Sequence, residues 1–244
     1  MAGDLVERGG VRVTQIETTR RVKALVPFHQ HAPHVVSMRF RRYAMLTIAF
    51  HSMARGNFMP APYKVAVLVG SLRKKSFNRM LANALSELAR PELSLDIVEI
   101  GALPFYNDDL EADAPAPWLA VRERLAAADA VLFVTPEYNR SVPAVLKNAV
   151  DVLSRPFGSS VLRGKPAAVV SASPGAMGGF GASHHLRQSL VCLGVNVMAS
   201  PEAYVGNVTA LFDDNGALNH AATTEFLKRF VGAFHAWIAR LSKS

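Results

Sequence analysis

The residues best suited to chemistry stand in one short loop of the sequence VAVLVGSLRKKSFN, which begins at Val65. Two hydroxyls, Ser71 and Ser76, flank the guanidinium of Arg73, and the side-chain amide of Asn78 follows. Hydroxyl, guanidinium and amide groups all donate hydrogen bonds, and donors at this spacing suit a phosphate. We therefore predict a phosphate-binding loop at this point of the chain.

The segments on either side of the loop would place it correctly. The apolar, valine-rich run Val65–Val69 suits a strand that is covered on both faces. Helical spacing begins at Arg79, and Phe77 between loop and helix is included in the predicted site. Backbone N–H groups and the positive end of a helix dipole favour an anion at such a junction. The alternative, a polar turn with an Asn cap, would explain the loop taken alone equally well.

The loop lacks the two best-known nucleotide-binding motifs, and their absence limits which phosphate ligands it could bind. The sequence has neither G-x-x-x-x-G-K-S/T nor G-x-G-x-x-G at this position, which argues against nucleoside triphosphates and a Rossmann pyrophosphate site. A single monophosphate held by hydroxyls and backbone amides is the chemistry of a flavodoxin-like FMN site. We expect FMN as the cofactor and no metal.

Length and composition fit one globular domain. The 244 residues are 50% hydrophobic, which is enough for a full α/β core, and no apolar run approaches the ~18 residues of a spanning helix. We expect a cytoplasmic protein with no membrane partner. The single cysteine, Cys192, lies in an apolar stretch and is predicted to be a packed thiol.

The net charge of +8 is concentrated at the start of the chain. Residues 1–62 hold nine Lys/Arg and three Asp/Glu, whereas the other 182 residues hold eighteen and sixteen. The basic residues do not interleave with aromatic residues, so nucleic-acid binding is not predicted. We interpret 1–62 as a basic, poorly ordered extension. The position of Met59 suggests a natural start there, with the upstream stretch as an extension or a mis-called start. Its histidines His29, His31 and His34 lack further ligands at metal spacing.

From residue 63 to residue 244, strand-like and helix-like segments alternate. Five strands and five helices of this kind predict an α/β, flavodoxin-like, doubly wound five-stranded parallel sheet with helices on both faces. The predicted strands are 65–69, 95–100, 130–135, 166–171 and 195–198. The predicted helices are 79–88, 116–127, 142–154, 184–193 and 223–241. Ligands of such sheets bind at the carboxyl ends of the strands.

Two further loops follow predicted strand ends. The first, TPEYNRSVP, offers the ring of Tyr138 and the amide of Asn139 to a flavin, and Ser141 is predicted to cap the next helix. The second, SASPGAMGGFG, contains Ser173 and Gly175 and has four glycines in eleven residues. Such a loop either brings bare backbone close to a flat ligand or is mobile.

The stretches GSLRKKSFNR, PEYNRSVPAVLKNAVD and SPGAMGG together resemble the NADPH-dependent FMN reductase family, including bacterial quinone and chromate reductases, over about 63–207. The resemblance implies homodimers or homotetramers. It also implies an FMN-phosphate loop and a loop at the edge of the flavin ring, which match Ser71, Arg73, Ser76 and Asn78, and Pro136, Glu137, Tyr138 and Asn139. This sequence departs from the family pattern at two positions. Arg140 stands at a position that varies in the family, and Ala172 stands where some quinone-reductase relatives have a serine.

The expected reaction is hydride transfer from NADPH or NADH to FMN and then to a quinone, free flavin, chromate or similar small acceptor. Because the flavin carries the chemistry, no catalytic acid or base is required, and we predict none at Asp108–Asp109 or His184–His185. Two alternatives remain open at this stage. One is a flavodoxin-like electron carrier, and the other is a binding protein that uses the basic N-terminal arm.

Overall fold

The computed structural model describes residues 61–243. The predicted basic extension, with Met59 and the three histidines, therefore lies almost entirely outside the described residues. The strands are β1 (Tyr63–Val69), β2 (Leu93–Val98), β3 (Ala130–Thr135), β4 (Pro166–Ala172), β5 (Asn196–Val197) and β6 (Ala203–Val205). The α-helices are α2 (Phe77–Leu88), α3 (Ala116–Ala126), α4 (Ala144–Leu153), α5 (Phe180–Cys192) and α6 (Ala221–Leu241). Short 3₁₀ turns lie at Asp108–Leu110 and Val208–Ala210.

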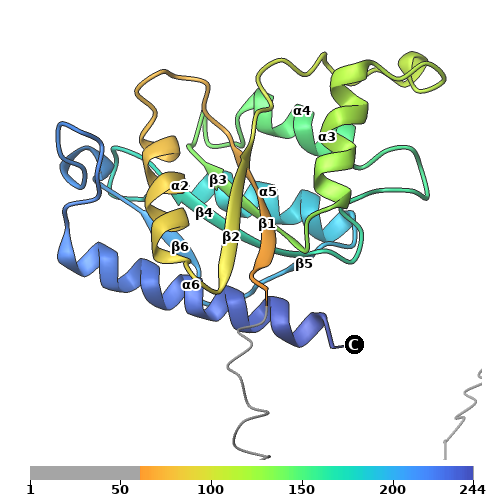
Figure 1. The fold of residues 1–244 in the computed structure, drawn as a ribbon. Coiled ribbons are helices and arrows are strands. Elements are labelled where there is room, and N and C mark those ends of the chain that lie inside the picture. The colour runs from red at the N-terminus through yellow and green to blue at the C-terminus, as the bar shows by residue number, and fades with distance from the viewer. Residues whose placement is uncertain (1–60, 244) are drawn as a thin grey trace, which may run out of the picture. The chain divides into compact units, whose positions relative to one another are not determined.

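The sheet is parallel, with the order β2-β1-β3-β4 and then β5, while β6 also pairs with β4 (Figure 1). This is the flavodoxin-like order, so the predicted fold class is confirmed. The order reverses beside β1, because the chain passes from β1 to β2 on one side and then to β3 on the other. Ligands bind such sheets near this switch point.

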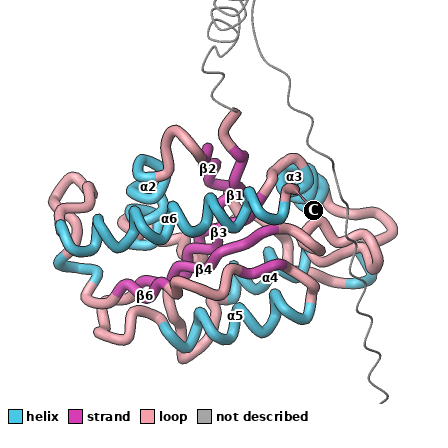
Figure 2. The backbone as a smooth tube through the Cα atoms, turned by 90° about the horizontal axis from the view of Figure 1, so that it is seen from below, coloured by secondary structure: helices cyan, strands magenta, loops and turns pink. Residues whose placement is uncertain are grey.

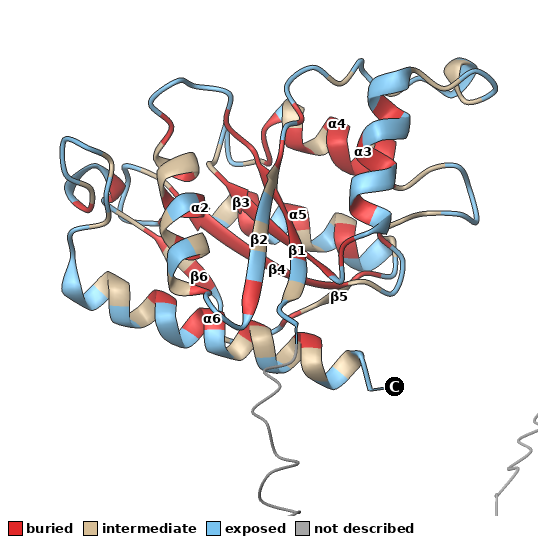
Figure 3. Ribbon diagram, in the orientation of Figure 1, coloured by how far each residue is buried: buried red, intermediate tan, exposed pale blue. Residues whose placement is uncertain are grey.

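Alternation along β1 builds two hydrophobic layers. Val65, Val67 and Val69 face the layer that contains α2 and α6, whereas Ala66 and Leu68 face the layer that contains α3, α4 and α5. In the view from below, α6 and α5 lie on opposite sides of β4 (Figure 2). Figure 3 shows the buried residues following the central strands and the inner sides of the helices. Burial on both faces explains why β1 has no polar position between Val65 and Val69.

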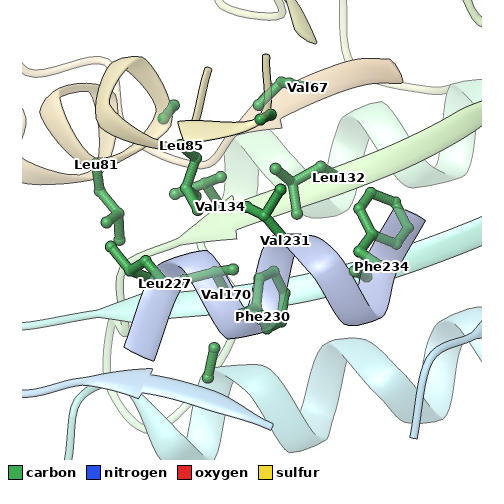
Figure 4. Packing of buried hydrophobic residues seen from close by; sticks show 14 of the residues in the cluster. Val67, Leu81, Leu85, Leu132, Val134, Val170, Leu227, Phe230, Val231 and Phe234 are labelled. Atoms are coloured by element: carbon green, nitrogen blue, oxygen red, sulfur yellow. The ribbon is translucent and has the colours of Figure 1, made fainter. Parts of the chain in front are cut away.

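The last helix closes one of these layers. Phe230 and Phe234 are buried in the same hydrophobic cluster as Leu132 of β3 and Leu85 of α2 (Figure 4). Each fully buried side chain of this size contributes about 1.5–3 kcal/mol relative to an exposed one. The indole N–H of Trp237 also donates to the Asn196 carbonyl at 2.8 Å, which fastens α6 to β5. Among the described residues, no helix has the length and apolar character that crossing a membrane requires.

The edge strands differ from the sequence prediction. The second strand lies two residues earlier than 95–100, because β2 pairs with β1 from Leu93 onward. The fifth strand is split: β5 pairs with the start of β4 and β6 with its end, and the prediction missed β6. Pro201 lies between the two pieces and has no N–H to donate to a ladder.

Three local expectations also need correction. Ser141 does not cap a helix, because α4 begins after Pro143 and the Ser141 hydroxyl bonds to the His185 ring instead. Helix α5 contains the predicted stretch from His184 to Cys192 but extends further toward the N-terminus, beginning at Phe180. Cys192 is exposed, because the last turn of α5 turns Leu190 inward and the thiol outward. An apolar sequence context is therefore a poor guide to which side a helical residue faces.

Candidate functional site

The candidate site begins where β1 ends at Gly70. The Gly70 N–H donates to the Val134 carbonyl at 2.9 Å, and a Cβ at this position would lie 3.1 Å from side-chain atoms of Leu146 and Thr135. The close approach of these neighbours favours glycine here. Because β1 ends just before this glycine, the next residue, Ser71, lies at the carboxyl edge of the sheet between β1 and β3.

Helix α2 starts directly beyond this loop. The buried Ser76 is its N-cap, and its hydroxyl accepts the Arg79 N–H at 3.3 Å. The first turn of α2 holds no acidic residue, so no side chain there offsets the positive end of the helix dipole. The N-terminus of α2 is therefore electrostatically suited to an anion.

Asn78 joins α2 to the end of β4. Its side-chain nitrogen donates to the Ala172 carbonyl at 3.2 Å, and this bond identifies which side-chain atom is nitrogen. Its oxygen, Oδ1, is buried and has no hydrogen-bond partner among residues 61–243. The sequence suggested that this amide donates to phosphate. The structure instead leaves an acceptor, which a ligand hydroxyl could satisfy at a buried position.

Arg73 occupies the outer side of the same loop. Its guanidinium carbon lies 4.9 Å from the centroid of the Phe77 ring, at cation–π distance. Phe77 in turn stacks on Phe212, with ring centroids 6.4 Å apart. The aromatic support orients an otherwise exposed cation beside the two serines.

The loop after β3 forms a closed two-residue turn. Tyr138 and Ser141 exchange two backbone hydrogen bonds of 3.0 Å each, and the residues between them, Asn139 and Arg140, have φ of 51° and 64°. Positive φ at both central positions defines a type I′ turn, which favours Asn and Gly. The turn presents Tyr138, which is 54% exposed, at the edge of the sheet.

Glu137 connects this turn to α5. Its carboxylate oxygen Oε2 accepts the Ala182 N–H at 3.0 Å in the first turn of that helix. Gly181 makes room for the carboxylate, since a Cβ there would lie 3.0 Å from Oε2. Glu137 thus caps α5 through its side chain.

The glycine-rich loop after β4 packs against β6. The Ser173 N–H donates to the Val205 carbonyl at 3.1 Å, and a Cβ on Gly178 would come within 2.6 Å of the Tyr204 backbone. At least one of the glycines therefore serves backbone-to-backbone packing within the protein. The backbone bond from Ser173 to Val205 ties the loop down at its first residue.

These three loops enclose a pocket of about 210 Å³ at the carboxyl ends of the strands. Nine of the eleven predicted site residues line it: Ser71, Arg73, Ser76, Phe77, Asn78, Pro136, Glu137, Tyr138 and Ser173. Asn139 and Gly175 do not line it, whereas Ala172, Pro174 and Val208 do and were not predicted as site residues. Val208 follows β6, and nothing in its local sequence indicates a site.

A larger pocket of about 300 Å³ lies elsewhere, between α2, the turn at Gly216 and the start of α6. Its lining includes Asn83, Glu87 and Thr224 but no cation. We therefore assign the site by its donors and its place at the switch point rather than by volume.

The titratable pairs noted in the sequence have separate structural partners. Asp108 accepts the Tyr106 hydroxyl at 2.8 Å, His184 bonds to the Tyr204 hydroxyl at 3.0 Å, and His185 bonds to Ser141 at 2.7 Å. Burial, with the Glu202 carboxylate, raises the pKa of Tyr204 to about 12. None of these side chains lines the 210 Å³ pocket.

Comparison with known proteins assigns the chain to a family. The profile of NADPH-dependent FMN reductases matches residues 63–210, which include all three loops of the pocket. This chain belongs to the NADPH-dependent FMN reductase family. As a member, it is an oxidoreductase that uses FMN and NAD(P)H.

Individual members of the family are similar over almost their whole length. A quinone reductase of Pseudomonas putida is 60% identical over 181 residues, which are 74% of this chain and 97% of that protein. A 2-hydroxy-1,4-benzoquinone reductase of a Burkholderia species is 45% identical over 175 residues, 72% of this chain and 96% of that protein. The solved structure of FerB, an NAD(P)H:(acceptor) oxidoreductase of Paracoccus denitrificans, is 45% identical and superimposes with a TM-score of 0.70. The superposition covers 73% of this chain and 98% of the FerB chain.

Proposed function

We propose that the 210 Å³ pocket binds FMN and that the protein passes hydride from NADPH or NADH through this flavin to a quinone. The observation that carries the proposal is the meeting of a donor-rich loop and an aromatic turn at the switch point of the sheet. The names of the relatives from Pseudomonas and Burkholderia support a quinone as the acceptor.

The donor-rich loop would hold the phosphate. Ser71 and Ser76 supply hydroxyls, α2 supplies its N-terminal N–H groups, and Arg73 supplies a charge-assisted contact. The free Oδ1 of Asn78 would accept a hydrogen bond from a hydroxyl of the ribityl chain. This assignment gives a partner to a buried acceptor that has none among the described residues.

The aromatic turn would support the flavin ring. Pro136, Glu137 and Tyr138 line this end of the pocket, and Asn139 completes the turn beside them. Ser173 also lines the pocket, and Gly175 follows it in the same loop. Bound here, the flavin would accept hydride and deliver electrons, while the chain's own residues orient it and leave one face open. The pocket is smaller than a typical ligand site of 300–1,000 Å³, which fits an exposed ring face.

We further propose a cytoplasmic homodimer or homotetramer that requires neither nucleic acid nor a membrane. Free flavin and chromate remain candidate acceptors beside quinones. A cytoplasmic location fits a reaction that consumes NAD(P)H.

Two measurements test the proposal. The purified protein should show a flavin absorption spectrum, and denaturation should release FMN rather than FAD. Steady-state rates with NADPH and a benzoquinone should give parallel double-reciprocal lines, because donor and acceptor would use one open face in turn. Intersecting lines would refute this alternation. NADPH oxidation that requires an added protein would instead indicate an electron carrier.

A further inference from the structure

Arg140 occupies a backbone conformation that suits glycine. It is the second central residue of the closed turn between Tyr138 and Ser141, with φ of 64°. Asn, which tolerates this region, occupies the first central position, but arginine has no local hydrogen bond that favours it there. A costly conformation that persists near a ligand pocket is a reason to look for a function of the side chain.

The Arg140 side chain also contributes little to the interactions that stabilise the protein. It is 83% exposed, and its Nη1 lies 3.6 Å from Oε1 of Glu137. Glu137 already accepts the Ala182 N–H and lies at the positive end of α5. The carboxylate therefore does not depend on Arg140 for its stabilisation. The weak ion pair holds the guanidinium beside a pocket-lining residue and leaves it free to approach another anion.

Two arginines lie at the proposed site: Arg73 lines the pocket in the phosphate loop, and Arg140 lies beside the pocket-lining Glu137 in the aromatic turn. Arg73 serves the phosphate end, and FMN has one phosphate. Arg140 stands at the ring end, where oxidised FMN carries no charged group. A cation at this end is therefore not required by oxidised FMN, and a role toward reduced FMN would show as a shifted reduction potential.

We propose that Arg140 recognises an anionic group of the redox substrate that approaches the open flavin face. This inference rests on the proposed function of the same site. The anion is either a phosphate of the nicotinamide nucleotide or an anionic group of the acceptor, such as chromate or the carboxylate of a quinone. Both are recognised by the same exposed guanidinium.

The experiment compares three variants of the full-length, FMN-loaded protein. Arg140→Gly removes the cation and relieves the backbone strain of a left-handed conformation at this position, whereas Arg140→Lys keeps the charge. Arg163→Gln is the control, because it removes an exposed cation just before β4, at the opposite end of the sheet. Melting temperature and FMN affinity are measured first, and Arg140→Gly should melt at the same temperature or higher.

The two half-reactions then identify the source of the anion. Anaerobic reduction by NADPH and by NADH reports on the nucleotide, and reoxidation by a neutral benzoquinone, a carboxylated quinone and chromate reports on the acceptor. In Arg140→Gly we expect one half-reaction with an anionic substrate to slow by about three- to tenfold at low salt, and less at high salt. Reoxidation by the neutral quinone should be unchanged, as should every rate in Arg163→Gln, and Arg140→Lys should retain most of the rate.

Three results would overturn the inference. The first is a set of equal rates in wild type and Arg140→Gly for all anionic substrates. The second is an equal loss with the neutral quinone. The third is a shifted flavin reduction potential, which would mean that the arginine acts on the flavin itself. If the wild-type protein binds no FMN or oxidises no NAD(P)H, the proposed function fails instead, so the two failures are distinguishable.

Discussion

The carboxylate of Glu137 accepts the backbone N–H of Ala182 at 3.0 Å, across 45 positions of sequence. This bond ties the turn after β3 to the start of the helix after β4. The predicted ring-edge loop is thereby braced by α5, and the hydroxyl of Ser141 adds a second contact through His185 at 2.7 Å. A residue that the sequence marks as a ligand contact is, in the structure, also a helix cap.

Replacing Glu137 should therefore affect stability as well as flavin binding. Glu137→Ala leaves the Ala182 N–H without its acceptor, which should lower the unfolding free energy by about 1–3 kcal/mol. For a domain of this size, each kcal/mol corresponds to a shift of about 2–4 °C in melting temperature. Glu137→Gln retains an acceptor oxygen and should lose less. Equal melting of the wild type and the alanine variant would show that the cap is unimportant.

Arg73 should matter for the cofactor and little for folding. An exposed guanidinium that contacts a phosphate contributes about 1.5–3 kcal/mol, so Arg73→Ala should weaken FMN roughly ten- to a hundredfold. Fluorescence titration of the deflavinated protein measures this affinity. Arg90→Ala is the control, because Arg90 is exposed beyond the far end of α2. Unchanged affinity in Arg73→Ala would exclude the phosphate assignment.

Asn78 provides a sharper test, because its two side-chain atoms have different surroundings. Asn78→Asp exchanges the donor to the Ala172 carbonyl for an oxygen and adds a negative charge beside the proposed phosphate. We expect FMN binding to fall further in Asn78→Asp than in Asn78→Ala, by about tenfold or more. Asn83→Asp makes the same change at an exposed position of α2 and should bind FMN normally. An aspartate variant that binds as well as the alanine variant would argue against a nearby phosphate.

The raised pKa of Tyr204 predicts that the folded protein loses stability in alkali. Its pKa is raised from 10.0 to about 12, first by burial and then by Glu202, so the folded protein favours the protonated phenol. This contribution is complete below pH 10 and disappears as the pH rises through about 12. Urea midpoints of the wild type should therefore fall between pH 10 and 11.5. The fall should be shallower in Tyr204→Phe, and an identical pH dependence would contradict the raised pKa.

A chain that starts at Met59 should keep the activity. The family profile begins at residue 63, and the 181 residues that match the Pseudomonas relative account for 97% of that protein. We expect FMN content, melting temperature and turnover of the shortened chain to lie close to those of the full chain. Loss of the flavin or insolubility on truncation would show that residues 1–58 are needed for the fold.

The sequence was most informative where the chain is buried on both sides. The apolar runs of β1, β3 and β4 could be read from Val65–Val69, Ala130–Thr135 and Pro166–Ser171, because central parallel strands have no polar face. The strand β6 escaped prediction because three residues, Ala203–Val205, carry no period long enough to recognise. Pairing with β4, a tertiary contact, is what makes them a strand.

The loops show the same limit. The residue types of the phosphate loop were readable, since Ser71, Arg73 and Ser76 adjoin one strand end. The partners of Asn78 and Glu137 were not, because Ala172 and Ala182 lie 94 and 45 positions away and interact through backbone atoms. Backbone partners leave no mark on residue type, so long-range caps of this kind require a structure.

The divided edge strand has a further consequence for solubility. An unbroken edge offers a row of free N–H and C=O groups on which a strand of another chain can assemble. Here β5 has two residues and β6 has three, and residues 198–202 with their proline separate them. At the opposite edge, Asp96 of β2 forms an ion pair with Arg124. We expect neither edge to template an intermolecular sheet, so this open α/β sheet resists aggregation without closing into a barrel.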